Sequence, residues 1–451
     1  MTRLDRGLAA ADERLRGWLL GRVSRGTGAA LAGLSALAFL ALMMTRTLTQ
    51  LAGAGMMLRL AGCAALALPM LVMTVSAMRI ARKREDSVLA ALLACALCGA
   101  AMLARVSFIE RSSGDYDIYL AGWLDQLAGA SFAQSMRGDV GEYNVLYQYI
   151  LFLITRLPVP PLYAVKAVSF IGDGLLAAAM AALCAKEERP SMAAFAAALL
   201  LPSAVLNGGM FAQCDSLYAG CALWGLAYAM GGKPGRSAAC FALSLAFKLQ
   251  AVFLLPVVAL LWAGRKLRLK DAAIFLAVLL AVMTPAILGG KSPARIIGIY
   301  TSQTGIYHGL NYNAAGFYGL METAGLDVYA YGNFSMALAL GACAAMLACA
   351  MRGAREMDAD RTVRFCFLMV TAVVFLLPRM HERYFYLADM LAVALCCRDR
   401  RYAPAAGMMA LASLSTCWET ALPLWAASLM VFSAWMYAAT AWNPSPDGGK
   451  A

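Results

Sequence analysis

Long apolar runs recur along this chain of 451 residues and constrain its fold more than any other feature. Many of them reach roughly 17 to 25 residues, the length that a helix needs to cross the hydrocarbon core of a bilayer. With 62% hydrophobic and only 14% charged residues, the composition excludes an ordinary soluble domain. The alternation of apolar and polar residues that marks outer-membrane strands is not visible, so the backbone has to satisfy its hydrogen bonds in helices. The sequence predicts an all-α polytopic membrane protein with about 11 to 13 transmembrane helices.

The basic residues indicate an orientation rather than a nucleic-acid partner. The formal net charge is +12, but Lys and Arg cluster in short loops between apolar runs, a pattern typical of cytoplasmic loops. The clusters are Arg79–Arg84, Gly232–Arg236, Arg265–Lys270, Arg352–Arg364 and Arg398–Arg401. We therefore expect no nucleic acid among the partners. We also expect the protein to be integral to the cell (plasma) membrane, with its N-terminus in the cytoplasm.

These markers divide the chain into five parts. Residues 1–26 are expected to form a cytoplasmic amphipathic helix on the membrane surface, the alternative being a solvated, partly disordered tail. Residues 27–105 form the N-terminal transmembrane helices, and residues 106–143 form a long outer loop that carries interfacial helices and the catalytic residues. Residues 144–440 form the main transmembrane bundle, and residues 441–451 a polar tail. Within residues 144–184 one half is expected to be re-entrant, and the sequence does not settle which.

The outer loop carries the candidate catalytic residues. Asp115 and Asp117 stand among the aromatic residues Tyr116, Trp123 and Tyr143. The run that follows has the pattern of an amphipathic helix, on which residues two apart point in different directions. We therefore expect one of the two aspartates, and not both, to point inward. The competing interpretation is that both carboxylates only solvate the loop.

Other polar residues fall on the same outer side, inside or beside apolar runs, where their cost in lipid makes them functional candidates. Simpler roles compete for four of them. Gln213 and Asp215 could cap the helix that follows, Lys248 could snorkel to the surface, and His308 could be an ordinary loop residue. The cluster Arg379–Arg383 is the hardest to dismiss, because its three potential cations are costly unless an anion such as phosphate binds there. The candidate substrate-binding residues are Tyr116, Trp123, Tyr143, Asn144, Gln213, Asp215, His308, Asn311 and Asn313, and the candidate donor-binding residues are Lys248, Gln250, Arg379, His381, Glu382 and Arg383.

A carboxylate beside a cationic cradle is suited to glycosyl transfer from a lipid-phosphate sugar. The carboxylate would take the proton of the acceptor hydroxyl, a contribution of about 10²–10⁴-fold. The cations would stabilise the charge that develops on the departing phosphate, and Tyr and Trp rings would offer the sugar a flat apolar face. One direct displacement would invert the anomeric centre. A divalent metal, Mg²⁺ or Mn²⁺, stays open, with Asp115 and Asp117 as its candidate ligands.

The order of these segments resembles that of the GT-C glycosyltransferases, and among them of bacterial membrane proteins related to the GPI-anchor mannosyltransferases. The resemblance covers residues 106–390 and implies a GT-C-like fold with a catalytic aspartate in the first long outer loop, matching Asp115. It also implies a polyprenyl-phosphate sugar donor, with mannose as a candidate sugar and His381, Glu382 and Arg383 near the phosphate. Two features depart from the family pattern: two extra spans precede the loop, and the usual Trp-Gly-Gln is replaced. The segments that carry the resemblance are Gly114–Tyr116, Gly141–Tyr147, Phe211–Tyr218, Lys248–Gln250 and Arg379–Tyr384.

The predicted function is an inverting glycosyltransferase that moves a sugar from a polyprenyl-phosphate donor to a glycan, lipid or protein acceptor at the outer face of the membrane. The rival function is a transporter or flippase of lipid-linked glycans or small solutes, which would place polar residues near mid-membrane in both halves of the chain. Lys166, Asp173 and Asp389 favour the transporter. The gathering of polar residues at the outer ends, without a visible internal repeat, favours the enzyme. A membrane O-acyltransferase using His381 or His308 is the third alternative.

Overall fold

The computed structural model describes residues 3–141, 143–306, 309–325, 332–417 and 422–441. Over these ranges the chain is helical nearly throughout, and the one sheet pairs two short parallel strands, β1 (Asn311–Tyr312) and β2 (Met380–His381). The protein is an all-α polytopic membrane protein. Six described helices are long and apolar enough to cross a membrane: α2 (Arg25–Thr45), α3 (Met56–Arg84), α4 (Val88–Val106), α8 (Pro161–Leu183), α14 (Asp271–Leu288) and α17 (Gly332–Met351).

A seventh candidate span is broken near its middle. The helices α9 (Met192–Leu200) and α10 (Pro202–Gly209) form an apolar pair bent by 52°. Pro202 has no N–H group and suits the first position of a new helix, so it ends α9 and starts α10. The predicted count of about 11 to 13 spans depends on further, shorter or more polar helices and stays a prediction. These helices are α11 (Asp215–Met230), α12 (Pro234–Phe247), α13 (Leu255–Ala263), α18 (Ala359–Leu376), α19 (Tyr386–Arg398), α20 (Ala403–Cys417) and α21 (Leu424–Thr440).

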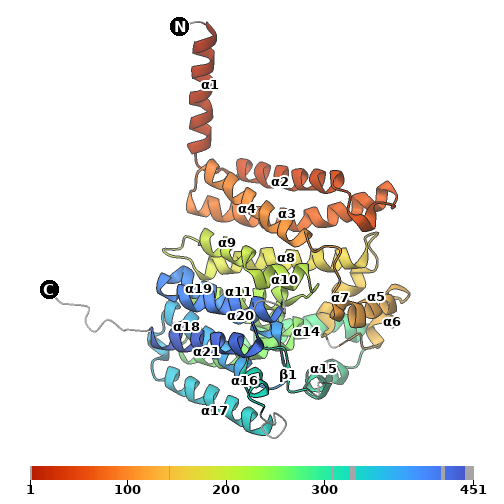
Figure 1. Ribbon diagram of the computed structural model, residues 1–451, viewed down its shortest axis with the longest axis vertical. Coiled ribbons are helices and arrows are strands. Elements are labelled where there is room, and N and C mark those ends of the chain that lie inside the picture. The colour runs from red at the N-terminus through yellow and green to blue at the C-terminus, as the bar shows by residue number, and fades with distance from the viewer. Residues whose placement is uncertain (1–2, 142, 307–308, 326–331, 418–421, 442–451) are drawn as a thin grey trace, which may run out of the picture.

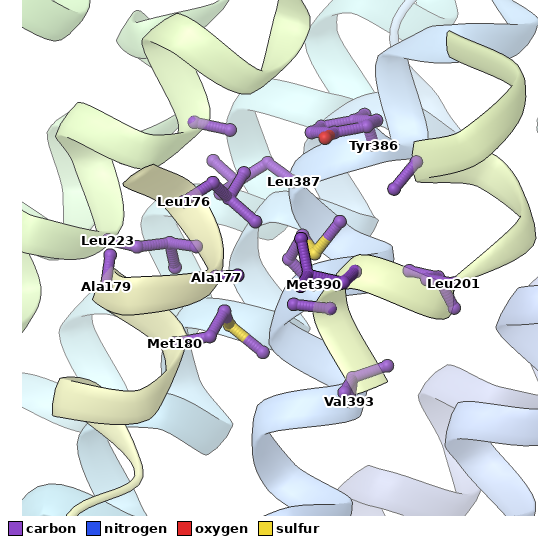
Figure 2. Close-up of a cluster of buried hydrophobic side chains, with 14 of the residues drawn as sticks. Leu176, Ala177, Ala179, Met180, Leu201, Leu223, Tyr386, Leu387, Met390 and Val393 are labelled. Atoms are coloured by element: carbon purple, nitrogen blue, oxygen red, sulfur yellow. The ribbon is translucent and has the colours of Figure 1, made fainter. Parts of the chain in front are cut away.

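The bundle is packed around α8, and α14 and α17 lie at its rim. In the spanning part of α8, 78% of the residues are buried within the protein, against 11% in α14 and in α17. Leu176 and Met180 of α8 meet Leu387 and Met390 of α19 in a central apolar cluster (Figure 2). Small residues in this cluster, such as Ala177, let neighbouring helix backbones approach closely. The exposed apolar faces of α14 and α17 are those of helices that border lipid.

The N-terminal helix α1 (Arg3–Leu20) stands clear of the bundle. It runs crosswise to α2, α3 and α4 (Figure 1), and its end is held by the turn between α3 and α4. The Val88 N–H donates to the Gly21 carbonyl over 2.9 Å, and the Val23 N–H donates to the Asp86 carbonyl over 3.1 Å. A helix crosswise to the spans has the direction of one that lies along a membrane surface, and the interfacial position of α1 stays a prediction.

Between residues 144 and 184, α7 (Val145–Ile154) is the shorter of the two helices. Its ten residues span about 15 Å, half the thickness of a bilayer core. Just after α7, Arg156 donates to the carbonyls of Leu127 and Ala128 in the outer loop, over 3.1 and 2.7 Å. The next helix, α8, starts at the same end of the bundle, because Lys166 donates to the Phe108 carbonyl over 2.7 Å. Both ends of α7 therefore lie at one end of the bundle.

The two ends of α8 lie beside different parts of the chain. One end meets the segment that leads into the outer loop, and the other meets basic segments. The Lys166 end meets the segment that leads into the outer loop. At the other end, Arg398 donates to the Leu183 carbonyl over 2.7 Å, and Arg84 donates to the Pro190 carbonyl over 3.2 Å. From Lys166 to Leu183 the helix rises about 25 Å. Two of the basic segments predicted to be cytoplasmic therefore lie at the end of the bundle opposite the outer loop.

Candidate active site

A cavity opens at the outer-loop end of the bundle, with about 850 Å³ of empty space when its open mouth is included. Segments far apart in the sequence form its wall: the outer loop, the start of α7, the turn before α11, the turn after α12, and the short helix before α19. Aromatic rings dominate the wall, and three charged side chains enter it. The lining residues are Asp115, Tyr116, Tyr119, Leu120, Trp123, Tyr143, Asn144, Tyr147, Phe211, Ala212, Gln213, Phe247, Lys248, Leu249, Gln250, Tyr300, Arg383 and Tyr384.

Asp115 lies at the centre of the polar side of this cavity. Its Oδ2 atom is 2.9 Å from Nη1 of Arg383 and accepts a hydrogen bond of 3.0 Å from Nε2 of Gln213. The same Arg383 nitrogen is 3.2 Å from Oε1 of Glu382. The Asp115 side chain is 35% exposed and that of Arg383 only 13%, so the carboxylate faces the opening and the guanidinium lies deeper.

A serine fixes the start of the helical turn that carries Asp115. The Ser113 hydroxyl accepts a hydrogen bond from the Tyr116 N–H over 3.2 Å and donates to the Phe211 carbonyl over 3.0 Å. The first contact starts the turn η2 (Tyr116–Leu120), and the second ties it to the segment before α11. The outer loop is therefore anchored to the bundle directly beside the candidate catalytic residue.

Asp117 is placed differently from the prediction of a second catalytic aspartate. It is exposed, lies outside the cavity wall and accepts a hydrogen bond of 2.8 Å from the Ser112 hydroxyl. Residues 115–120 are helical, so a side chain two positions after Asp115 points away from it. The two carboxylates do not converge, and no group of three His, Cys, Asp or Glu side chains within the described ranges could hold a metal ion. The donor set does not fit the divalent metal that the sequence left open.

Lys248 forms the second cationic part of the wall. The helix α12 ends at Phe247, and Lys248 is extended, with its Nζ atom 2.5 Å from Oδ1 of Asp215. The ammonium group lies 5.8, 6.0 and 5.9 Å from the ring centres of three tyrosines. It is therefore held in place by a buried carboxylate and aromatic faces, and does not snorkel toward the surface. The three rings belong to Tyr143, Tyr218 and Tyr384.

Asp215 supports the site from behind. Its side chain is fully buried and lies outside the cavity wall, where Oδ1 meets Lys248 and Oδ2 accepts a bond of 2.9 Å from Nδ2 of Asn207. It is the first residue of α11 and not its N-cap, which is Cys214. The predicted substrate contact by Asp215 is not what the structure has, because both carboxylate oxygens bind buried protein groups.

Two of the three asparagines predicted to bind substrate, Asn311 and Asn313, hold a loop together. Nδ2 of Asn313 donates to the Thr416 carbonyl over 2.7 Å, and Oδ1 of Asn311 accepts from the Ala314 N–H over 3.1 Å. Strand β1 then pairs with β2, and the Tyr312 ring stacks on the His381 ring at 4.7 Å. Neither asparagine lines the cavity. His308 lies outside the described residues.

The charged cluster before α19 contributes one cation to the cavity wall where the sequence predicts three. Arg379 is exposed and lies outside the wall. Burial, reinforced by the charges of Arg383 and Lys248, lowers the pKa of His381 to about 3, so its ring is neutral at pH 7. Burial raises the pKa of Glu382 against the pull of Arg383. Burial opposes the charge of Arg383 too, but Glu382 and Asp115 outweigh it and raise its pKa. His381 and Glu382 thus stand behind Arg383 and do not line the cavity.

The aromatic side of the cavity depends on one glycine. Gly141 has a φ of +64°, and a Cβ atom there would lie 2.4 Å from the ring of Trp123. The indole lies against the bare backbone and meets the Tyr143 ring edge-on, with ring centres 6.0 Å apart. The Tyr143 ring in turn lies 4.7 Å from that of Tyr147. This wall offers the apolar faces and polar edges on which sugar rings stack.

Several lining residues are not among those that the sequence predicts. Tyr119, Tyr147, Phe211 and Tyr384 stand within or next to the segments singled out there, so their position in the chain was a usable signal. Tyr300 carried no signal, because it is an isolated aromatic residue in α15 (Pro293–Ile306). It reaches the wall because its hydroxyl donates to the Leu245 carbonyl in α12 over 2.9 Å. Asn144, predicted to bind substrate, lines the cavity and also caps α7 through its Oδ1 atom.

Comparison of the chain with models of known protein families and with curated protein sequences gives no match.

Proposed function

We propose that this protein is an inverting glycosyltransferase that moves a sugar from a polyprenyl-phosphate donor to an acceptor at the outer face of the membrane. The observation that carries the proposal is the ion pair of Asp115 and Arg383 in the wall of one cavity. These residues come from distant segments, and each is a group that this chemistry needs. The aromatic wall around them suits a sugar better than it suits an inorganic ion.

The reaction requires one bond to form and one to break. The oxygen of the acceptor hydroxyl attacks the anomeric carbon, and the bond from that carbon to the phosphate oxygen breaks on the opposite face. The leaving polyprenyl phosphate keeps the electron pair, and Asp115 takes the acceptor proton. Arg383 and Lys248 lie where they can stabilise the negative charge on the leaving phosphate. Attack and departure on opposite faces invert the anomeric centre.

Asp115 has to be free of Arg383 before it can act as a base. Arg383 holds Asp115 at 2.9 Å. A donor phosphate is an anion that a guanidinium can bind through two oxygens. We expect the phosphate to compete with Asp115 for Arg383, which frees the carboxylate for the acceptor. Donor binding would then prepare the base as well as the leaving group.

The setting of the cavity agrees with a lipid-borne donor. The basic segments around Arg84 and Arg398 lie at the opposite end of α8, so the positive-inside pattern favours a cavity on the outer side. The donor's polyprenyl chain would stay in the bilayer beside the bundle. The acceptor, a glycan, lipid or protein, would enter from the aqueous side. The resemblance to the GT-C glycosyltransferases, with mannose as the candidate sugar, agrees with this arrangement.

The rival transporter function has less support. Arg105 and Asp173 lie deep in the bundle, where a transport site would be expected. They are 0% and 3% exposed and bind each other at 2.7 Å. A pair sealed in this way stabilises helices and does not line a path for a solute.

Purified protein supplied with a panel of polyprenyl-phosphate sugars tests the proposal. We expect one donor to be consumed, and Asp115→Asn to reduce turnover by about 10²–10⁴-fold because it removes the base. Asp117→Asn is the matched control: it removes a carboxylate of the same loop that lies outside the cavity, and should keep near-normal turnover. Full activity of a correctly folded Asp115→Asn protein would exclude this mechanism.

A further inference from the structure

We propose that Gln213 is the positioning residue of Asp115, holding Oδ2 through its side-chain amide so that Oδ1 faces the acceptor hydroxyl. The inference rests on the proposed role of Asp115 as the base. It differs from the role that the sequence predicts for Gln213, which is direct contact with substrate. The two roles lead to different kinetics, so they can be separated.

The chemistry of its neighbours fixes the orientation of the Gln213 amide. A carboxylate only accepts hydrogen bonds, so the group that faces Oδ2 of Asp115 at 3.0 Å has to be the NH₂ group. The amide oxygen then faces Tyr143, whose hydroxyl donates to it over 3.1 Å. Burial raises the pKa of Tyr143 well above its usual value, so this hydroxyl keeps its proton and remains a donor. Tyr143 therefore donates to Gln213, and Gln213 donates to Asp115. We call this chain of two hydrogen bonds the relay.

The backbone holds Gln213 on three sides. Its N–H donates to the Asn207 carbonyl over 2.9 Å, and its carbonyl accepts from the Ser169 hydroxyl over 2.7 Å. Two residues earlier, the Phe211 carbonyl accepts a hydrogen bond from Ser113 in the outer loop. Between them Ala212 adopts a φ of +53°, a left-handed conformation that costs a non-glycine residue free energy. Strain of this kind persists where surrounding contacts fix the backbone. Here those contacts hold the backbone in a conformation from which the side chain of Gln213 reaches Asp115.

The relay matters most when the donor is bound. In the structure Arg383 and Gln213 both bind the same oxygen, Oδ2. Once the donor phosphate takes Arg383, Gln213 keeps the carboxylate from rotating. Because Oδ2 carries the amide hydrogen bond, Oδ1 is the more basic oxygen and the one that we assign to proton transfer. A base held in this way is already aligned with the acceptor hydroxyl.

Two substitutions isolate the amide. Gln213→Glu keeps the shape of the side chain and an acceptor for Tyr143 but loses the N–H donated to Asp115, and Gln213→Leu removes both contacts. We expect kcat to fall about 10- to 100-fold in both variants, with the donor KM within about threefold of the wild-type value. A raised KM with an unchanged kcat would mean that Gln213 binds substrate, and would overturn the proposal. Gln126→Leu, an exposed change of the same kind in the outer loop, is the matched control.

Tyr143→Phe tests the direction of the relay. Alone it should lower kcat less than Gln213→Leu does, because the amide keeps its contact with Asp115. Added to Gln213→Leu it should lower kcat no further, since the hydroxyl then has no amide to orient. Independent, additive losses would overturn the relay.

A readout without turnover separates this proposal from the proposed function. A water-soluble carbodiimide labels carboxyl groups, and mass spectrometry of the purified protein follows the label on Asp115. Loss of the amide donor should make Asp115 react faster in Gln213→Leu and Gln213→Glu than in the wild type or in Gln126→Leu. Equal rates would overturn the positioning role, whatever the enzyme assay shows. Faster labelling in a protein that consumes no sugar donor would support positioning and refute the glycosyltransferase.

Discussion

The charged residues in the cavity wall are each bound to another charged residue. Arg383 contacts two carboxylates, Asp115 and Glu382. Lys248 contacts Asp215, whose second oxygen accepts a hydrogen bond from the neutral amide of Asn207. A ligand that enters has to exchange with these contacts, so its affinity reflects the difference between new and old partners. This favours an anion with several oxygens, such as a phosphate, over a neutral solute.

Buried His381 makes the stability of the fold depend on pH. Its folded-state pKa, about 3, lies below the unfolded value near 6.5, so between these pH values the unfolded chain binds a proton that the folded protein does not. The contribution of neutral His381 to the free energy of unfolding is complete above pH 6.5. It is lost as the pH falls from 6.5 toward 3, by about 1.4 kcal/mol per pH unit. The melting temperature in detergent should therefore fall more between pH 7 and pH 5 for the wild type than for His381→Gln. Equal losses would mean that His381 is not buried in its neutral form.

At the residue scale, the sequence predicts which polar residues belong to the site better than it predicts what each of them binds. Asp115, Gln213, Lys248 and Arg383 stand out because polar groups in an apolar context need a reason, and the structure brings all four into one wall. What a single sequence does not contain is which polar groups bind one another. Asp215 looks like a ligand contact until its buried partner, far along the chain, is known.

At the scale of helices, Arg105 connects three elements below the cavity. Its guanidinium lies at the end of α4, pairs with Asp173 of α8 at 2.7 Å and donates to the Leu199 carbonyl of α9 over 2.8 Å. Leu199 lies just before the break at Pro202, where carbonyl groups lose their helical partners. Arg105 thereby stabilises the bend that leads through α10 to the turn of Gln213.

Removing Arg105 alone should lower the free energy of unfolding more than removing both Arg105 and Asp173. Arg105→Met leaves the Asp173 carboxylate buried without its cation, which destabilises by about 3–5 kcal/mol. The double change Arg105→Met with Asp173→Leu should recover part of that loss, since no unpaired charge remains. Thermal unfolding in detergent measures both, with the exposed Arg46→Met as the control. An unchanged melting temperature for the single variant would contradict the bridging role.

Helices are predictable from the sequence to the extent that their apolar runs are long. The N-terminal transmembrane helices predicted within residues 27–105 correspond to α2, α3 and α4, because each apolar run is nearly uniform in composition. The sequence does not predict the topology of residues 144–184, because a short apolar helix has the same composition whether it crosses the membrane or turns back. Its fate is decided by contacts such as those of Arg156 with the outer loop. Composition predicts how long an apolar helix is, but long-range contacts decide whether it crosses the membrane or turns back.

At the scale of the whole molecule, charge and cavity define opposite ends. The basic segments at Arg84 and Arg398 meet the far end of α8, while the cavity opens beside the end near Lys166. A protein inserted by the positive-inside rule would present the cavity outside the cell. Helix α1 would then lie along the cytoplasmic surface, crosswise to the spans (Figure 1). Orientation is thus a property that the whole fold predicts and that no single loop settles.

Two introduced cysteines test this orientation in intact cells. Gln126→Cys lies exposed in the outer loop, and Arg400→Cys lies exposed in the segment that follows α19. With a membrane-impermeant maleimide, Gln126→Cys should be labelled in intact cells above the background of the wild type and its 13 cysteines. Arg400→Cys should be labelled above that background only after the cells are permeabilised. The reverse pattern would turn the cavity toward the cytoplasm, where the lipid-linked donor and its acceptor would both have to be supplied from inside, and the transfer proposed at the outer face would be excluded.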